Sequence, residues 1–473
     1  MSITISTVPF LVLIAILYLR AQKQLFPVLM FTTIFQGAAL VIIGSGTSGL
    51  SLAPAQIVLG LLIIQKMMRR PERTNSALQA QTNVTTCLFL YASYALLTAI
   101  FCPFFFEGIS VSNPRSGMGA PLSWGMYNVT QSTYLLLGIA VYWLCVYRSS
   151  LSEIKRSLDW YLAGSTFAAL LAMYQYIAFN TGLPFPSEII HSNTQHTIFE
   201  AYDLGGFTRV NSTFTEAAAA AGCFSTALAL VLWRVLFVEC NRKLIVCLIS
   251  LLTGLILTRS TTGYVALAFI AVMVALLYLR KTVVTPKVRL FRNCLALGVF
   301  VIGAAAFLLP EVRSGINDLL DKVLFTKTKS SSYEERTAWN NAALAAASNS
   351  HWIGAGWGSL RASSLIANIL GTVGIPGLLL FASFCTLNIR YATKAPSDST
   401  QMQKTAILPI LVSLLACVLA GPEMTDPVVW FMFGVAAFSI PRSHLRLPVL
   451  ERAGMGPVIR TRPPETTSLA FPH

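Results

Sequence analysis

Four arginines stand close to the ends of apolar segments, where their side chains could bind an anion. They are Arg209, Arg259, Arg336 and Arg361. An arginine side chain is a planar fork of N–H donors whose geometry matches phosphate and diphosphate. A single arginine in such a place is also explained by snorkelling, in which the charged head reaches the membrane surface while its stem stays in lipid. Both explanations stay open for each residue, and four such arginines on one side of a membrane favour an anion site.

The stretch "FTRVNSTFTEAAAAAGCFSTALAL", Phe207 to Leu230, predicts the start of a helix. Its Ser and Thr residues precede a run of small residues, so we expect them to cap the helix, and the Glu216 carboxylate suits a helix N-terminus. Capping does not account for Arg209, because a cation is unfavourable there unless an anion lies beside it.

The stretch "LTRSTTGYVAL", Leu257 to Leu267, joins two apolar segments by a tight turn that holds Arg259 at the membrane face. Gly263 and the neighbouring Ser and Thr residues suit a turn followed by a helix cap. Tyr264 fits two roles equally well, an aromatic anchor at the membrane surface or a contact to substrate.

The third stretch, Ser330 to Ser364, predicts a short helix over Tyr333 to Ala347 and then the glycine-rich loop "GAGWGS". This loop is not a nucleotide-binding P-loop, because no Lys-Ser/Thr pair follows the glycines and no strand precedes them. The dinucleotide fingerprint fails as well, because its spacing and its βαβ context are missing. We expect the glycines to make a tight return into a membrane span near Ser364, with Arg361 near a phosphate.

Few residues suit a metal, and few suit a general base. No Asp-x-Asp or clustered His/Asp/Glu pattern indicates a bound metal, and no cofactor is predicted. His191, His196 and His351 lie in loops and could act as general bases, although loop histidines are more often solvated surface residues.

These segments belong to a chain of 473 residues that is 55% hydrophobic and only 11% charged. A soluble protein of this length carries roughly 25% charged residues, and apolar runs long enough to span a membrane recur throughout. The predicted fold is all-α: a polytopic helical membrane protein with about 12–13 transmembrane helices and a long loop, residues 310–363, before the eleventh. The expected spans are 4–19, 25–43, 50–67, 84–103, 129–147, 159–180, 214–237, 244–258, 262–280, 293–309, 364–389, 405–421 and 425–440, of which 244–258 and 425–440 could be half-helices. Residues 1–440 form the predicted membrane domain.

The loops between these spans alternate in charge, and most of the 34 lysines and arginines fall on one side. The positive-inside rule assigns that side to the cytoplasm, which puts the N-terminus and the long loops 104–128, 181–213 and 310–363 outside. The C-terminus is then inside, and residues 441–473 form a basic, disordered cytoplasmic tail. The net charge of +15 indicates this topology and an attraction to anionic membrane lipids. A nucleic-acid partner is excluded, because no soluble domain carries a basic patch.

Four sequence pieces, taken in order, resemble the O-antigen ligase and Wzy-type polysaccharide polymerase superfamily of bacterial envelope enzymes. They are an entry to a span (Arg209 to Glu216), a Thr-Arg-Ser-x-x-Gly turn (Thr258 to Gly263), an Arg-x-x-Trp-like element (Arg336 to Asn340), and the glycine-rich loop with the following "LGTVGIPGLLLF" segment. Together they cover about residues 200–390.

The resemblance implies a metal-independent, inverting glycosyltransferase in the bacterial inner membrane, working at its periplasmic face. The donor it implies is an oligosaccharide on undecaprenyl diphosphate, and the arginines, with Arg209 and Arg259 first, would hold the diphosphate leaving group. Such charge stabilisation of a leaving group is a common source of catalysis. A chain-length regulator and a flippase are the protein partners that the resemblance suggests.

One departure from the family pattern favours a polymerase over a ligase. Ligases of the family carry a histidine ten residues before a glycine, and counting back from Gly374 gives Ser363. The general base is therefore unassigned, with four candidates: His351, Glu216, Glu335 and Asp203. Three functions stay open: polymerisation of repeat units for an exopolysaccharide, capsule or O-antigen; ligation of a finished chain to an acceptor; and transport of a polysaccharide or lipid. Transport is disfavoured because the span centres carry almost no charge.

Overall fold

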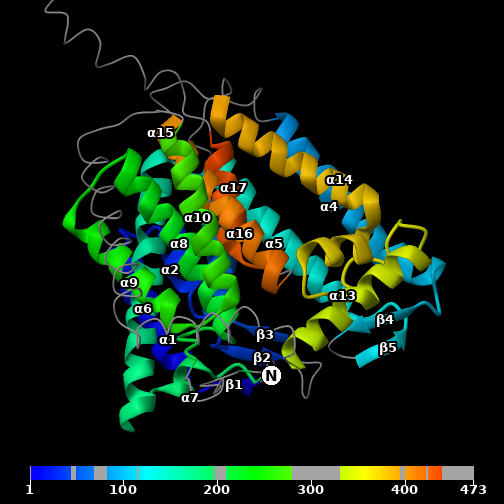
Figure 1. Cartoon of the computed structure of the whole chain (residues 1–473), viewed down its shortest axis with the longest axis horizontal. Helices are drawn as coiled ribbons and strands as arrows, with labels where there is room; N and C mark the ends of the chain where they lie inside the picture. Colours follow the sequence, from blue (N-terminus) through cyan, green and yellow to red (C-terminus); the bar gives the residue numbers. More distant parts are fainter. Residues whose placement is uncertain are drawn as a thin grey trace, which may run out of the picture. The chain divides into compact units, whose positions relative to one another are not determined.

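The computed structural model describes residues 2–43, 50–68, 82–113, 117–194, 198, 209–279, 331–394, 400–421 and 424–438. Within these residues the chain is mostly helical, as Figure 1 shows. The helices are α1 (Thr7–Arg20), α2 (Leu25–Thr32), α3 (Pro54–Met68), α4 (Thr82–Phe105), α5 (Met126–Arg148), α6 (Leu151–Thr181), α7 (Ser187–Ile190), α8 (Ala217–Phe237), α9 (Arg242–Leu257), α10 (Thr261–Leu279), α13 (Ser331–Asn349), α14 (Leu365–Lys394), α15 (Thr400–Thr405), α16 (Ile407–Ala420) and α17 (Pro427–Ala437).

Six of the described helices are long and apolar enough to cross a membrane. They lie within α4, α5, α6, α8 and α14 and over Met402–Ala420, and α1, α3, α10 and α17 are shorter apolar helices. The prediction of a polytopic helical membrane protein is confirmed. The predicted span 293–309 and the tail 441–473 lie outside the described residues.

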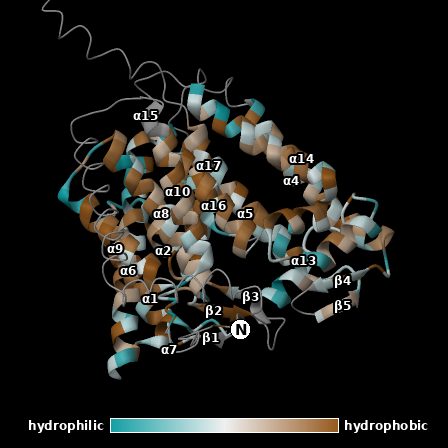
Figure 2. Cartoon of the chain, viewed as in Figure 1, coloured by the Kyte–Doolittle hydropathy of each residue, from teal (hydrophilic) through white to brown (hydrophobic). Residues whose placement is uncertain are grey.

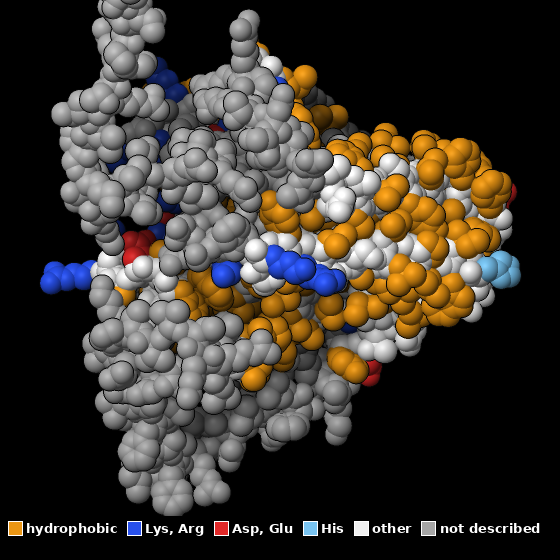
Figure 3. All heavy atoms as spheres, turned by 90° about the horizontal axis from the view of Figure 1, so that it is seen from above, with side chains coloured by type: hydrophobic (Ala, Val, Ile, Leu, Met, Phe, Trp, Pro, Cys, Tyr) orange, Lys and Arg blue, Asp and Glu red, His pale blue; other side chains and the backbone are white. Residues whose placement is uncertain are grey.

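Large hydrophobic side chains also face outward on these helices. Leu90, Leu97, Leu170, Ile249 and Val272 are each about half exposed. In Figure 2 the hydrophobic colour runs along α8, α10, α16 and α17, and in Figure 3 hydrophobic side chains cover much of the described surface on the side shown. An apolar surface of this extent suits lipid rather than water.

The predicted span 25–43 is wrong as a single helix. Helix α2 ends at Thr32, and the chain then turns into strand β2 (Val41–Ile43), which pairs antiparallel with β1 (Ser2–Ile3) and β3 (Leu50–Leu52). The turn passes through Gly37, whose N–H donates to the Thr213 carbonyl at 2.8 Å. A β-carbon at Gly37 would lie 2.8 Å from the His191 ring, so the segment bends where its backbone meets another loop.

Helix α13 and the glycine-rich loop share a small core with the hairpin of β4 (Ser110–Asn113) and β5 (Gly117–Pro121). Val111 and Leu122 from the hairpin pack with Ala343 and Ala346 of α13 and with Leu360. In Figure 1, α13 lies beside β4 and β5, close to the end of α4 and the start of α14. This core positions the backbone at Arg361, whose N–H donates to the Ser112 carbonyl at 3.0 Å.

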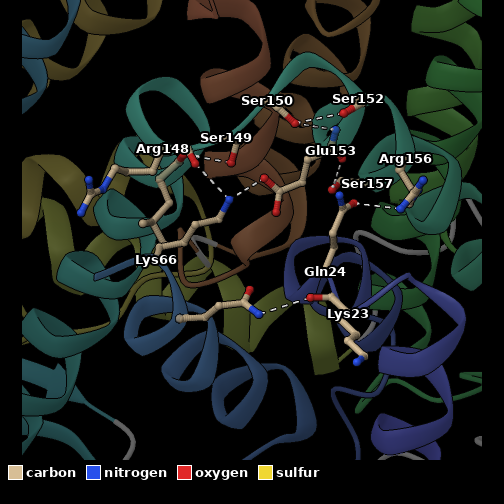
Figure 4. Close-up of polar contacts among 12 residues, drawn as sticks. Lys23, Gln24, Lys66, Arg148, Ser149, Ser150, Ser152, Glu153, Arg156 and Ser157 are labelled. Carbon is tan, nitrogen blue, oxygen red and sulfur yellow. Dashed lines mark hydrogen bonds and ion pairs between the residues drawn. The ribbon is translucent and has the colours of Figure 1, made fainter. Parts of the chain in front are cut away.

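A buried ion pair joins the ends of α3 and α6, as Figure 4 shows. Lys66 Nζ lies 2.5 Å from Glu153 Oε2, with side-chain exposures of 8% and 6%, and it also donates to the Arg148 carbonyl at 3.0 Å. Ser150 caps α6 by accepting the N–H of Glu153. Lys66, Arg148 and the nearby Arg156 belong to the basic loops that the sequence predicts on the cytoplasmic side.

Candidate functional site

The loop before α8 is held by buried hydrogen bonds. The Gln175 side chain in α6 accepts from the backbone N–H groups of Asn211 and Ser212 at 3.1 and 2.7 Å, and it donates to Asn211 Oδ1 at 2.9 Å. Ser212 Oγ donates to the Ala168 carbonyl at 2.7 Å. These contacts fix the point at which the chain enters α8.

The predicted capping of α8 by Ser and Thr is therefore wrong. The N-cap residue of α8 is Glu216, and its side chain makes no cap hydrogen bond. Ser212 and Thr213 instead donate to carbonyls of other segments, Ala168 and Ile34. Their hydroxyls fasten the loop to its neighbours, and Glu216 starts the helix as expected.

Glu216 meets one of the four arginines. Arg336 Nη2 lies 3.4 Å from Glu216 Oε2, and the two side chains are 25% and 35% exposed. The composition of the sequence predicts a short helix over Tyr333 to Ala347, and α13 confirms it. Its second turn brings Arg336 to the start of α8.

Glu216 also lines a cavity of about 110 Å³ that a second arginine reaches. Arg361 and Asp426 share this cavity with Glu216, together with the polar side chains of Gln36 and Thr215. The rest of the wall consists largely of small or apolar residues from α8, α16 and α17. Charged groups that converge in a wall of small and apolar residues are one feature of ligand sites.

Arg209 and Arg259 form a neighbouring group that does not line this cavity. Arg209 Nε donates to the carbonyl of Thr258 at 3.4 Å, the residue before Arg259. Arg259 has a positive φ of 48°, and its guanidinium lies 5.9 Å from the centre of the Tyr176 ring. The structure thus brings these two arginines to one turn.

The same turn packs against the beginning of α8. A β-carbon on Gly263 would lie 3.1 Å from that of Ala221, and the Tyr264 hydroxyl donates to the Ile256 carbonyl at 3.2 Å. Tyr264 therefore braces the turn between α9 and α10. Both arginine groups thus lie near the first turns of one helix, α8.

The glycine-rich loop acts as a tight return into α14, which begins at Leu365. Gly354, Gly356 and Gly358 all have positive φ, a conformation that favours glycine. The loop is also bound to α5, where Asn128 Nδ2 donates to the Trp357 carbonyl at 2.9 Å.

The remaining candidate bases lie apart from the cavity. His351 is exposed on the turn after α13, and Glu335 is exposed on the surface of that helix. His191 is half-buried and its Nε2 lies 2.8 Å from the Ser212 carbonyl, so it supports the loop before α8. His196 and Asp203 lie outside the described residues. Ser363, in place of the ligase histidine, uses its N–H to donate to Asn340 Oδ1 at 2.9 Å.

The sequence reasoning missed Asp426. A local signal was present, because an Asp-Pro pair directly before an apolar run marks a helix N-terminus. Its place beside Glu216 and Arg361 depends on the packing of α17 against the bundle, which no local pattern reveals. Among the described residues, no three His, Cys, Asp or Glu side chains are grouped to hold a metal ion.

The comparison with protein families places part of this site in a known domain. Residues 245–382 match the family model described as O-antigen ligase (Wzy_C). This stretch contains Arg259, Tyr264, Arg336 and Arg361, whereas Arg209, Glu216 and Asp426 lie outside it. No curated protein matches the chain. Residues 245–382 of the chain are therefore similar to the O-antigen ligase family, which confirms the resemblance to the O-antigen ligase and Wzy-type superfamily.

Proposed function

We propose that the protein polymerises lipid-linked oligosaccharide repeat units into exopolysaccharide, capsule or O-antigen. The donor would carry its sugars on undecaprenyl diphosphate, and the reaction would take place at the periplasmic face of the bacterial inner membrane. The observation that carries the proposal is a cavity lined by Glu216 and Arg361, with Arg336 paired to the same Glu216 carboxylate. Arg336 and Arg361 both lie in the stretch that matches the O-antigen ligase model.

In this proposal the arginines stabilise the leaving group. The acceptor oxygen attacks the anomeric carbon of the donor, and the bond from that carbon to the diphosphate oxygen breaks. Negative charge then develops on the diphosphate, and preorganised guanidinium groups stabilise it most strongly in that state. Arg336 and Arg361 would contact the diphosphate at the cavity, with Arg209 and Arg259 completing the cationic surface beside α8. The chemistry asks for no metal, and inversion follows from a single displacement.

Glu216 would hold Arg336 when no donor is bound. Its carboxylate is a partly exposed partner at 3.4 Å, so a diphosphate that carries more negative charge can replace it. Tyr264 would act as a brace of the turn that carries Arg259. His351 is left out of the proposed centre because it is exposed and is not part of the cavity wall.

Polymerisation is preferred to ligation because Ser363 stands where ligases of the family have a histidine. A serine hydroxyl is a poor base at neutral pH. The description of the matched domain as an O-antigen ligase supports the second candidate, transfer of a finished chain to an acceptor.

Deletion of the gene from its own host separates the two candidates. A polymerase predicts that single repeat units are still made while long polymer disappears. A ligase predicts that long polymer accumulates on the carrier lipid and fails to reach its acceptor. Unchanged polymer length and unchanged attachment would exclude both functions.

A further inference from the structure

Asn340 on α13 binds the loop that carries Arg361. Its Oδ1 accepts the N–H of Ser363 at 2.9 Å and the N–H of Ser364 at 3.0 Å. An amide oxygen has two lone pairs, so these two hydrogen bonds use both of them. The contact is made just after Arg361 in the chain, where the loop enters α14. One side chain of α13 thus holds two consecutive backbone groups of the loop.

The preceding N–H groups of the loop are held by other elements. The N–H of Arg361 donates to the carbonyl of Ser112 in β4 at 3.0 Å, and the N–H of Ala362 donates to Asn368 Oδ1 in α14 at 3.2 Å. The loop backbone is therefore fixed to β4 and α14, and Asn340 fixes it to α13. This last contact is the one that bears on the two arginines of the proposed centre.

Helix α13 also carries Arg336, one helical turn before Asn340. Side chains four residues apart in a helix lie on the same face, so Arg336 and Asn340 project from one side of α13. Arg336 pairs with Glu216 at 3.4 Å, and Glu216 and Arg361 line one cavity. The segment with Arg336 and the segment with Arg361 therefore meet at Asn340.

We propose that Asn340 is a positioning residue that sets the spacing of Arg336 and Arg361, so that both arginines bind one diphosphate. The inference rests on the proposed glycosyl transfer, whose leaving group is a diphosphate. Asn340 acts through Arg361 and does not itself contact the substrate. Donors that are held in place before binding lose less conformational freedom when the anion binds, and without Asn340 part of this advantage is lost.

The test is the binding of undecaprenyl diphosphate to the full-length protein in detergent, measured below the unfolding temperature of each variant. Asn340→Ala removes the acceptor of both N–H groups. Asn341→Ala is the matched control, because Asn341 is the next residue on α13 and its side chain is exposed. Both changes are also made in Arg361→Ala protein, because a residue that acts through Arg361 should be coupled to it. Asn340→Ser, whose shorter side chain reaches less far, replaces the alanine variant if that protein does not fold.

We expect Asn340→Ala to weaken binding by about five- to tenfold, no more than the loss of one hydrogen bond to a charged group. In Arg361→Ala protein the same change should weaken binding by about twofold or less, and Asn341→Ala should bind as its parent does. A merely structural role for Asn340 predicts equal losses in the two backgrounds, and that result would overturn the assignment. A loss of less than about twofold in the wild-type background would overturn it as well. Wild-type protein that does not bind undecaprenyl diphosphate would overturn the proposed function, an outcome distinct from normal binding by Asn340→Ala.

Discussion

Arg336 and Glu216 join two segments that are far apart in the chain: the Arg336 guanidinium on α13 lies 3.4 Å from the Glu216 carboxylate at the start of α8. The pair sits beside the cavity that Arg361 and Asp426 reach. A partly exposed ion pair of this length contributes little to stability. Its significance is that a bound diphosphate can replace Glu216 as the partner of Arg336.

The exchange predicts that Glu216 competes with the donor for Arg336. We expect Glu216→Gln to tighten the binding of undecaprenyl diphosphate by up to about fivefold, because an ion pair of this kind is worth up to about 1 kcal/mol. In an Arg336→Ala background the same change should have a smaller effect, because the Arg336 partner is gone. Isothermal titration in detergent measures both, and an equal effect in the two backgrounds would contradict the mechanism.

Arg336 itself should matter more than other surface arginines. Arg336→Ala is expected to weaken diphosphate binding by about tenfold or more, since a hydrogen bond to a charged group contributes about 1.5–3 kcal/mol. The control is Arg242→Ala, an exposed arginine at the start of α9. Equal binding by the two variants would remove Arg336 from the site.

Arg259 permits a test in which the fold is not disturbed. Its φ of 48° is a conformation that glycine adopts at no steric cost. Arg259→Gly should therefore fold as well as wild type while the joining of repeat units falls by about 100-fold or more, the scale found for lost charge stabilisation of a transition state. Arg259→Lys should recover only part of the rate, because an ammonium lacks the planar fork. A glycine variant that joins repeat units normally would exclude Arg259 from the reaction.

Unlike the Arg336–Glu216 pair, the buried Lys66–Glu153 pair should affect the stability of the protein. Glu153→Gln leaves a lysine that is 8% exposed without its counter-charge, which costs about 3–5 kcal/mol. The double variant Lys66→Met/Glu153→Leu should regain most of this stability, because a buried pair can be replaced by packed apolar side chains. Thermal unfolding in detergent checks the cycle, and equal stability of wild type and Glu153→Gln would argue against the pair.

Gly374 is predicted to tolerate no side chain. A β-carbon there would lie 2.0 Å from the Trp352 carbonyl oxygen, and its φ is 65°. We expect Gly374→Ala to prevent accumulation of folded protein. Gly60→Ala in α3, where a β-carbon meets nothing within 4 Å, should be neutral or stabilising by up to about 1 kcal/mol. Normal yield and thermal stability of Gly374→Ala would show that the loop can shift.

The sequence was sufficient for features that depend on local composition and periodicity. The membrane helices, α13 and the return of the glycine-rich loop into α14 all follow from apolar length, helix-forming residues or turn chemistry. The segment after Thr32 was mispredicted because its residues are apolar enough to continue a helix. In the structure the chain bends there, because Gly37 lies against Ile190, His191 and Thr213. The capping of α8 failed for a similar reason, because hydrogen bonds to the carbonyls of Ala168 and Ile34 hold the Ser212 and Thr213 hydroxyls against other segments.

The candidate site divides in the same way. Sequence reasoning found its cations, because arginines beside apolar segments are conspicuous. It did not find that Arg336 meets Glu216 while Arg209 meets the turn of Arg259, because those contacts join separate helices. Asp426 is an ordinary helix cap in the sequence and reaches the cavity only through the packing of α17.

The break in α14 at Gly374 ties the position of Arg361 to the folding of that helix. At the break, the carbonyls of Gly371 and Thr372 accept the N–H groups of Ala355 and Gly356 at 2.8 and 2.9 Å, so the loop replaces a missing turn of the helix. Without the loop, these buried carbonyls would lose their partners, at a cost of about 1–3 kcal/mol each. Closure of the loop on α14 therefore satisfies the broken helix and sets the backbone of Arg361 in place at the same time.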